Sequence, residues 1–333
     1  MSSAQAAGGN ENVLNQGATS EGVILEAGGC IVTILPQFGG KIASIRLRDR
    51  ELLQQPLAPI APRTQTMGFE EGDASGWDEC LPSVAACRVN FDGGTAEIPD
   101  HGDLWRVEWQ STGTSDEERG TNSLALRAQC FSLGLELERT VALTETENGW
   151  RIGLDYRLTN TGTAPAPWSW AAHPLFLAGA GDRITLPDSI RTLRLEGSGG
   201  GRLGKNGDAV SWPVAKLEDG GETNLSLALA PDSGIGDKLF AGPVAAAGNW
   251  AELVRPSAGV KIRVSFDAAA TPYLGLWICY GGWPDRDGPK QTCVALEPAT
   301  APVDSLAEAG SWMRQLGPGE WFKWSMQVEI ESL

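Results

Sequence analysis

The sequence comprises 333 residues, 41% of them hydrophobic and 20% charged, which are proportions typical of a globular protein with a large ordered core. Its 42 acidic residues outnumber the 26 basic ones, giving a formal net charge of -16, and no run of Lys or Arg is long enough to follow a phosphate backbone. This composition argues against nucleic acids and anionic membrane surfaces as partners.

Residues 1–21 are rich in Ser, Ala, Gly, Asn and Gln, and they lack the basic start and apolar stretch of a secretory signal. We therefore expect a flexible leader, followed by one domain that spans residues 22–333. No apolar segment approaches the ~18 residues that a membrane-spanning helix needs. The six cysteines are scattered without a CxxC pair, so we expect reduced thiols in a cytoplasmic protein, although their even number leaves disulfides open.

Alternating apolar and polar side chains, which indicate half-buried strands, recur along the chain. The clearest runs cover residues 133–137, 151–158, 260–266 and 324–330. Clusters of turn-forming residues separate such runs at 92–94, 147–149 and 197–201. Because strands continue on both sides of every Gly- and Pro-rich stretch, the pattern predicts an all-β fold, a large antiparallel sandwich of two sheets with few short helices.

Three segments are longer than ordinary hairpin loops, namely residues 56–80, 92–104 and 196–222. Loops of this length usually carry function, so we expect them to form the walls of a cleft. Only residues 303–313 predict a helix, and a short one.

The chain contains only two histidines, His101 and His173, so any imidazole chemistry depends on one or both of them. Histidine titrates closest to neutral pH and is therefore suited to transferring protons to or from a substrate. Glu297 ends an apolar strand and is followed at once by Pro298. Partial burial at a cleft would raise its pKa and make it a general base, whereas a solvent-exposed acid at a strand exit is the alternative.

Several common catalytic motifs are missing from the sequence, including GxSxG, HExxH and the Walker-type phosphate loop. Gly199, Gly201 and Gly204 match the letters of GxGxxG, but the polar residues that follow favour a flexible loop over a dinucleotide site. The pair Gly39-Gly40 is isolated within a hairpin-like stretch and therefore indicates a turn or bulge and not a phosphate site.

Six motifs, taken together and in this order, resemble the aldose 1-epimerase family over nearly the whole chain from about residue 22. They are Phe38-Gly39-Gly40-Lys41-Ile42-Ala43-Ser44, Asp100-His101-Gly102, His173-Pro174-Leu175-Phe176, Tyr273-Leu274-Gly275-Leu276-Trp277, Leu296-Glu297-Pro298 and Leu316-Gly317-Pro318-Gly319-Glu320. The resemblance implies a galactose mutarotase-like β-supersandwich and an isomerase that interconverts the α and β anomers of a hexose through ring opening.

The resemblance also implies roles for three residues. Glu297 matches the general base that takes the proton from the C1 hydroxyl, and His173 matches the general acid that protonates the ring oxygen. His101 matches a second histidine that binds the sugar and polarises that oxygen. Because a base and an acid suffice for this reaction, we expect no metal or organic cofactor. The expected partner is a small sugar, and we expect a monomer or a weak homodimer.

Sugar contacts are predicted at seven further positions: Asp237, Trp77, Asp78, Glu79, Trp105, Arg106 and Trp277. Trp105 stands where the family commonly has an arginine, with Arg106 following it, and Leu175 replaces the usual aromatic residue after His173-Pro174. These departures leave the identity of the sugar open. The alternatives are a hexose-6-phosphate epimerase, for which only Arg63, Arg88 and Arg106 lie in suitable loops, and a sugar-binding protein without turnover.

Overall fold

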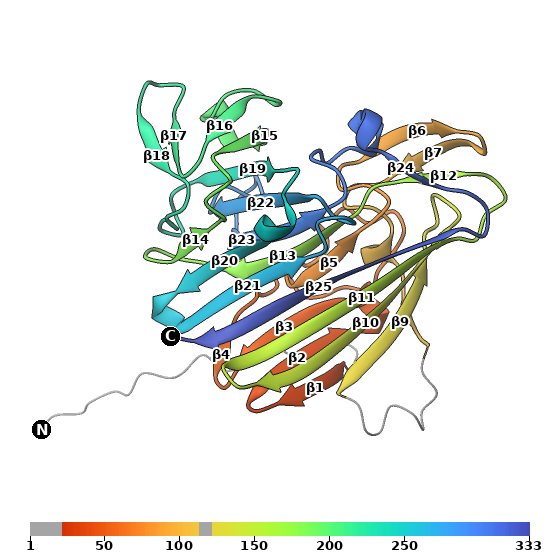
Figure 1. The fold of residues 1–333 in the computed structure, drawn as a ribbon, viewed down its shortest axis with the longest axis horizontal. Coiled ribbons are helices and arrows are strands. Elements are labelled where there is room, and N and C mark those ends of the chain that lie inside the picture. Colours follow the sequence, from red (N-terminus) through yellow and green to blue (C-terminus); the bar gives the residue numbers. More distant parts are fainter. Residues whose placement is uncertain (1–21, 113–121) are drawn as a thin grey trace, which may run out of the picture.

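The computed structural model describes residues 22–112 and 122–333, so the predicted leader at residues 1–21 lies outside the described residues. Two antiparallel sheets form the body of the described chain (Figure 1). Every helix within the described ranges is a three-residue 3-10 turn, and none is long and apolar enough to cross a membrane. The predicted all-β sandwich is therefore confirmed. All six cysteines carry free thiols.

The first sheet has eleven strands in the order β1-β2-β3-β5-β13-β23-β22-β19-β15-β16, with β4 paired to β3. Their bounds are Val23–Ala27 (β1), Cys30–Leu35 (β2), Lys41–Leu47 (β3), Arg50–Glu51 (β4), Trp77–Cys80 (β5), Ala171–Leu177 (β13), Thr292–Ala299 (β23), Tyr273–Tyr280 (β22), Ile235–Ala241 (β19), Thr192–Ser198 (β15) and Ala209–Ser211 (β16). The centre of this sheet thus brings together strands that are far apart in the sequence.

The second sheet has eight strands in the order β14-β20-β21-β25-β11-β10-β9-β8. Their bounds are Arg183–Thr185 (β14), Trp250–Arg255 (β20), Val260–Phe266 (β21), Trp321–Ser332 (β25), Gly149–Asn160 (β11), Leu135–Thr146 (β10), Ser123–Gln129 (β9) and Gln110–Ser111 (β8). The strands predicted at 151–158, 260–266 and 324–330 lie within β11, β21 and β25. The run predicted at 133–137 starts two residues too early, because β10 begins at Leu135.

The hydrophobic core lies between the two sheets, because each sheet turns its alternating apolar side chains toward the other. Trp77, Ala172 and Leu296 of the first sheet belong to this core, together with Ile152 and Leu154 of the second. The intervening positions of the first sheet point to its opposite face. That opposite face carries the polar residues described in the next subsection.

Parts of the three predicted long loops are strands, which corrects those predictions. Residues 56–80 end in β5, and residues 92–104 contain β7 (Gly94–Ile98), which pairs with β6 (Cys87–Phe91). Residues 196–222 contain β16 and β17 (Val214–Lys216), and β17 pairs with β18 (Glu222–Asn224). Such short strands offer too few residues for an alternating pattern to be visible. A last small sheet joins β12 (Ala166–Trp168) to β24 (Arg314–Leu316).

The short helix predicted at 303–313 is wrong. This segment contains two 3-10 turns, Leu306–Glu308 and Gly310–Trp312, and Gly310 has a left-handed φ of +50°, which interrupts any continuous helix. The other 3-10 turns are Pro36–Phe38, Leu104–Arg106, Gly199–Gly201, Ala246–Gly248 and Pro256–Ala258.

The pair Gly39-Gly40 forms the predicted turn between β2 and β3, and both residues have left-handed φ angles of 80° and 61°. A Cβ on Gly39 would lie 2.5 Å from the backbone of Trp105, and one on Gly40 would lie 2.6 Å from the ring of Trp109. The absence of both side chains therefore lets the segment around Leu104–Arg106 pack against this turn.

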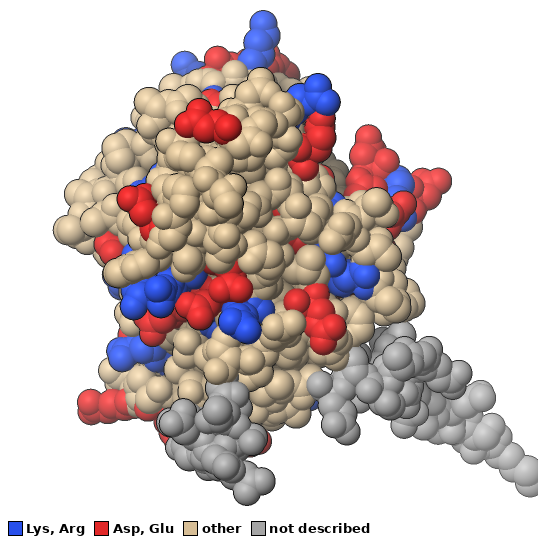
Figure 2. All heavy atoms as spheres, turned by 90° about the vertical axis from the view of Figure 1, so that its right-hand side faces the viewer, with Lys and Arg blue, Asp and Glu red and all other residues tan. Residues whose placement is uncertain are grey.

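The described surface mixes charges of both signs. Figure 2 shows Lys and Arg side chains next to Asp and Glu side chains on one face of the molecule, without a continuous basic area among the described residues of that face. Ion pairs such as Arg88–Glu97 and Arg151–Glu329 are exposed examples of this pairing.

Candidate active site

Four polar side chains, Lys41, Asp78, His173 and Glu297, follow one another across β3, β5, β13 and β23. Asp78 is the direct cross-strand partner of His173, and the register of β13 with β23 places His173 opposite Glu297. On the other side, the register of β3 with β5 places Lys41 beside Asp78. All four are buried and lie on the face of the first sheet that points away from the core, and we call them the polar row.

Glu297 occupies the centre of the site. Its Oε2 forms a buried ion pair with Lys238 of β19, whereas its Oε1 has no hydrogen-bond partner and lies 3.7 Å from Nε2 of His173. Gly275 of β22 is the cross-strand partner of Glu297, and a Cβ there would lie 2.7 Å from Oε2. The missing side chain of Gly275 therefore gives the carboxylate room to reach Lys238.

Burial changes the acid–base properties of these groups. It raises the pKa of Glu297, although the Lys238 ammonium partly counteracts this effect. Burial lowers the pKa of His173 well below its usual value, and the nearby His101, Lys238 and Lys41 lower it further. For Lys238 burial acts to lower the pKa, but Asp304 and Glu297 outweigh it and raise the pKa above its usual value. Glu297 is thus a stronger base than a free carboxylate.

His101 lies at the rim, on a tight turn with a left-handed φ of 59°. Its Nδ1 lies 2.9 Å from Oδ2 of Asp100, and its ring stacks on Phe69 with the ring centroids 3.6 Å apart. The rings of His101 and His173 meet edge to face, with their centroids 5.1 Å apart. The next residue, Gly102, leaves no room for a side chain, because its Cβ would lie 2.2 Å from the carbonyl oxygen of Leu81. The turn therefore holds His101 against the same space as His173.

A cavity of about 160 Å³ lies over these groups. It is lined by Phe69, Val84, Ala85, Asp100, His101, His173, Lys238, Trp277, Trp283, Gln291 and Asp304. Two of the predicted loop segments, 56–80 and 92–104, contribute to this lining, whereas 196–222 does not. A larger and more open depression of about 540 Å³ lies over the second sheet, but neither histidine lines it. Glu297 lies beneath the first cavity, against His173, and lines neither of the two.

Three of the predicted sugar contacts lie on β5 and not in a loop. Trp77 packs into the core between the sheets, and Glu79 lies between the sheets with hydrogen bonds from Arg139, Tyr156 and Trp170. The strand turns both side chains away from the cavity, which corrects the prediction that they contact the sugar. Asp78 is on the cavity face of the sheet, but it lies beneath the surface beside Lys41 and does not line the cavity.

Asp237 is also turned away from the cavity, which corrects its predicted role. Its carboxylate is fully buried and accepts hydrogen bonds from Ser198 and Arg202. The next residue, Lys238, points into the cavity because successive side chains of a strand lie on opposite faces. Sequence reasoning missed Lys238, although the period-two alternation with the buried Phe240 was a usable signal.

Trp105 and Arg106 were predicted to contact the sugar, but neither lines the cavity. Both pack against residues that form its wall. Trp105 packs edge to face against Phe69 with centroids 5.3 Å apart, and Arg106 donates to the carbonyl oxygens of Met67, Asp100 and Gly102. Burial lowers the pKa of Arg106 to about 10. The predicted Trp277 does line the cavity.

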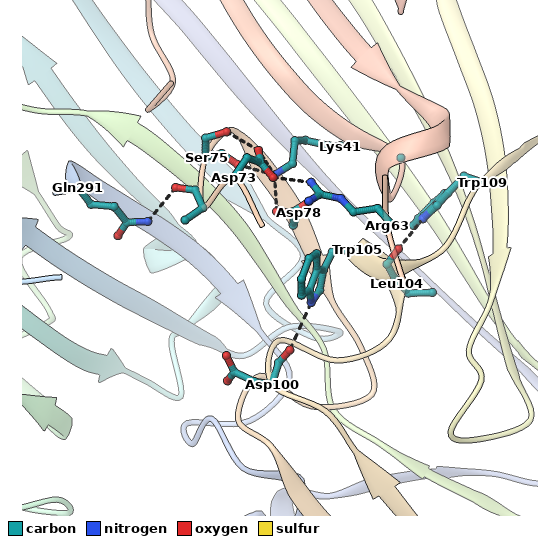
Figure 3. Close-up of polar contacts among 12 residues, drawn as sticks. Lys41, Arg63, Asp73, Ser75, Asp78, Asp100, Leu104, Trp105, Trp109 and Gln291 are labelled. Atoms are coloured by element: carbon teal, nitrogen blue, oxygen red, sulfur yellow. Dashed lines mark hydrogen bonds and ion pairs between the residues drawn. The ribbon is translucent and has the colours of Figure 1, made fainter. Parts of the chain in front are cut away.

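A buried ion-pair cluster fastens the segment that carries Phe69. Figure 3 shows Lys41 and Arg63 converging on Asp73 and Asp78. The Lys41 ammonium lies 2.5 Å from Asp78, 3.3 Å from Asp73 and 2.5 Å from the carbonyl oxygen of Ser75. Although burial acts to raise it, Lys41 and Arg63 lower the pKa of Asp73 to about 2. The cluster thus ties residues 63–75 to β3 and β5.

Comparison with family models of protein sequences found no match, and comparison with curated proteins found none either. Solved structures, in contrast, are similar over nearly the whole chain. The Slr1438 protein from Synechocystis sp. PCC 6803 has a TM-score of 0.69 at 17% identity, covering 97% of this chain and 100% of that one.

Two further structures have names that bear on the fold. A candidate aldose 1-epimerase from Escherichia coli K12 has a TM-score of 0.66 at 18% identity and covers 94% of this chain and 99% of its own. A galactose mutarotase related enzyme from Lactobacillus acidophilus has a TM-score of 0.63 at 15% identity, with coverages of 94% and 98%. The chain therefore has the galactose mutarotase-like fold, as its motifs predicted.

Proposed function

We propose that this protein is an aldose 1-epimerase-like isomerase that interconverts the α and β anomers of a hexose. The observation that carries the proposal is the pair formed by Glu297 and His173. Their facing atoms, Oε1 and Nε2, are 3.7 Å apart, and Oε1 has no other partner. A base and an acid that face each other beside a cavity are what ring opening requires, because one oxygen of the anomeric centre loses a proton while its neighbour gains one.

In the proposed reaction Glu297 takes the proton from the C1 hydroxyl, and His173 delivers a proton to the ring oxygen as its bond to C1 breaks. The freed aldehyde rotates, and ring closure on its other face reverses both proton transfers. His101 holds the ring oxygen side of the sugar. Each of the two proton-transfer groups is expected to contribute on the order of 10² to 10⁴-fold to the rate.

The lining of the cavity suits a pyranose. Trp277 and Trp283 supply aromatic faces for the C–H groups of the ring, and Oδ1 of Asp304, which lies 3.5 Å from the Lys238 ammonium and accepts no hydrogen bond from the described residues, is a candidate acceptor for a hydroxyl. The Nε1 of Trp277 is already bonded to Gln291, which fixes the orientation of this indole.

A phosphorylated hexose receives no support from the arginines proposed for it. Arg63 and Arg106 are buried and bound to protein groups, and Arg88 pairs with Glu97 at an exposed position. None of the three lines the cavity. A sugar-binding protein without turnover is the remaining alternative, but binding alone does not demand a facing base and acid.

The decisive experiment measures mutarotation of freshly dissolved α-anomers across a panel of aldoses, by polarimetry or NMR. The wild type is expected to accelerate equilibration of at least one hexose, and Glu297→Gln is expected to abolish the acceleration. Glu147→Gln, at an exposed position between β10 and β11, is the matched control and is expected to keep full activity. Binding of a sugar without acceleration by the wild type would assign the protein to the non-catalytic alternative.

A further inference from the structure

We propose that Asp78 is a positioning residue for His173, and that its free carboxylate oxygen accepts a hydrogen bond from Nδ1–H of the imidazole, directly or through one water. This inference rests on the proposed function, because it explains how a deeply buried imidazole is able to take up and deliver a proton. The Lys41 ammonium holds Oδ2 of Asp78 on the side of His173 away from Glu297, so Asp78 acts through His173 and not on the sugar.

The geometry of the polar row supplies the first argument. Asp78 and His173 are direct partners on the adjacent strands β5 and β13, and such partners have Cβ atoms roughly 4.5–5.5 Å apart on the same face of a sheet. Oδ2 of Asp78 is engaged by the Lys41 ammonium at 2.5 Å.

The second argument is that two complementary atoms of this pair have no partner. Oδ1 of Asp78 and Nδ1 of His173 are both buried and lack a hydrogen bond to any residue that the structure describes. Buried polar groups are almost always hydrogen-bonded to protein or to ordered water. An acceptor and a potential donor on neighbouring side chains satisfy each other most simply.

The third argument is that this bond defines what the other nitrogen does. The hydrogen bond made by one imidazole nitrogen sets the tautomer and leaves the other nitrogen to carry out the chemistry. With Nδ1–H held by Asp78, Nε2 is the nitrogen that takes up and releases a proton, and Nε2 is the one that faces Glu297 at 3.7 Å.

Charge balance gives a fourth argument. Burial, His101, Lys238 and Lys41 all disfavour the imidazolium form of His173, yet the proposed reaction requires that form before the ring opens, when His173 still holds the proton that it delivers to the ring oxygen. Two carboxylates flank the imidazole along the polar row, Asp78 on one side and Glu297 on the other. In this state Glu297 has to keep Oε1 free for the sugar proton, so Asp78 is the carboxylate that stabilises the imidazolium from its Nδ1 side. Burial raises the pKa of Asp78 above its usual value, and the Lys41 ammonium offsets part of this effect.

The test is ¹⁵N NMR of the full chain with labelled histidine. Only two imidazoles contribute, and His101→Gln identifies the signals of His173. Above the titration of His173, the wild type is expected to carry its proton on Nδ1 with Nε2 bare, whereas Asp78→Ala is expected to move the proton to Nε2. Asp73→Asn removes the other carboxylate bound to Lys41 and is expected to leave the Nδ1 proton in place.

A wild-type spectrum with Nδ1 bare would overturn the proposal, and this measurement remains decisive if a variant fails to fold. For activity, Asp78→Asn keeps the shape of the side chain and removes its charge, and kcat is expected to fall about ten- to a hundredfold at unchanged KM. An unchanged kcat also contradicts the proposal. If the wild type shows no mutarotation, the proposed function fails, but the tautomer of His173 still decides the role of Asp78.

Discussion

Two fully buried glutamates of the first sheet, Glu79 and Glu297, occupy similar settings and differ in how well their oxygens are satisfied. Burial raises the pKa of both. Glu79 accepts from Arg139 and Tyr156 at Oε1, at 3.0 and 2.9 Å, and from Trp170 at Oε2 at 2.9 Å. Among the described residues Glu297 has a single hydrogen-bond donor, Lys238, and its Oε1 accepts no hydrogen bond.

This difference in hydrogen bonding assigns a structural role to Glu79 and a chemical role to Glu297. Glu79 faces the second sheet, where Arg139 and Tyr156 come from β10 and β11, so its network joins the two sheets. Glu297 points to the other face of the same sheet, where an unpaired oxygen beside a cavity is free to take a proton. A buried carboxylate whose oxygens are all hydrogen-bonded stabilises the fold. A buried carboxylate with one free oxygen stabilises it less but can accept a proton.

The strongest expected effect is on the rate of Glu297→Gln. Removing the base is expected to slow mutarotation by about 10³-fold, within the range known for general bases. The free energy of unfolding is expected to change by less than about 1 kcal/mol, because one carboxylate oxygen has no partner and Lys238 keeps Asp304 at 3.5 Å. Progress curves and urea denaturation measure the two quantities. A large loss of unfolding free energy in Glu297→Gln would show that Glu297, like Glu79, has a structural role.

Glu79→Gln is expected to show the opposite pattern. The variant leaves Arg139 buried without its counter-charge, and breaking such a pair typically costs about 3 to 5 kcal/mol of unfolding free energy. The rate per folded molecule is expected to stay at the wild-type value. Urea denaturation checks the loss, and Tyr156→Phe, which removes one neutral donor, is expected to cost only about 1 kcal/mol. A variant of full stability would show that the network does not join the sheets.

Gly275→Ala tests whether the space beside Glu297 matters. The new Cβ would lie 2.7 Å from Oε2, so the carboxylate has to shift from its place beside Lys238, and we expect a rate loss of about tenfold. Gly153→Ala on β11 is the matched control, because its Cβ would meet no atom within 4 Å. Equal rates for both variants would mean that the position of this carboxylate is not critical.

The sequence predicted the main strands and the central residues of the site. Alternation predicted the strands around Ile152 and Val264, because each has one buried and one solvated face. The motifs also identified His101, His173 and Glu297, which the structure brings together although they lie far apart along the chain. A tight turn and the strand β13 hold the two histidines at one cavity, and β23 places Glu297 beneath it, against His173.

The sequence was a weaker guide to the neighbours of these residues. The short strand β5 was hidden within a predicted loop, so Trp77 and Glu79 were assigned to the sugar although they belong to the core side. Asp237 was chosen because it resembles the family's acidic residue that holds sugar hydroxyls, but β19 turns Asp237 away from the cavity and its neighbour Lys238 toward it. The partners of Arg106 and Asp78 depend on contacts between distant segments, which local patterns do not contain.

The smallest expected effects are shifts of the pH profile produced by the two charged neighbours of Glu297. The rate depends on ionised Glu297, so kcat/KM falls as the pH drops through its pKa. Lys238→Met removes a cation that lowers this pKa, and the acid limb is expected to move to higher pH by about one unit. Asp304→Asn removes an anion that raises it, and the limb is expected to move to lower pH. Profiles of kcat/KM against pH for both variants check the two directions. Shifts of the same sign would show that Glu297 is not the group that titrates, because the pKa of a group beside both charges shifts in opposite directions when one or the other is removed.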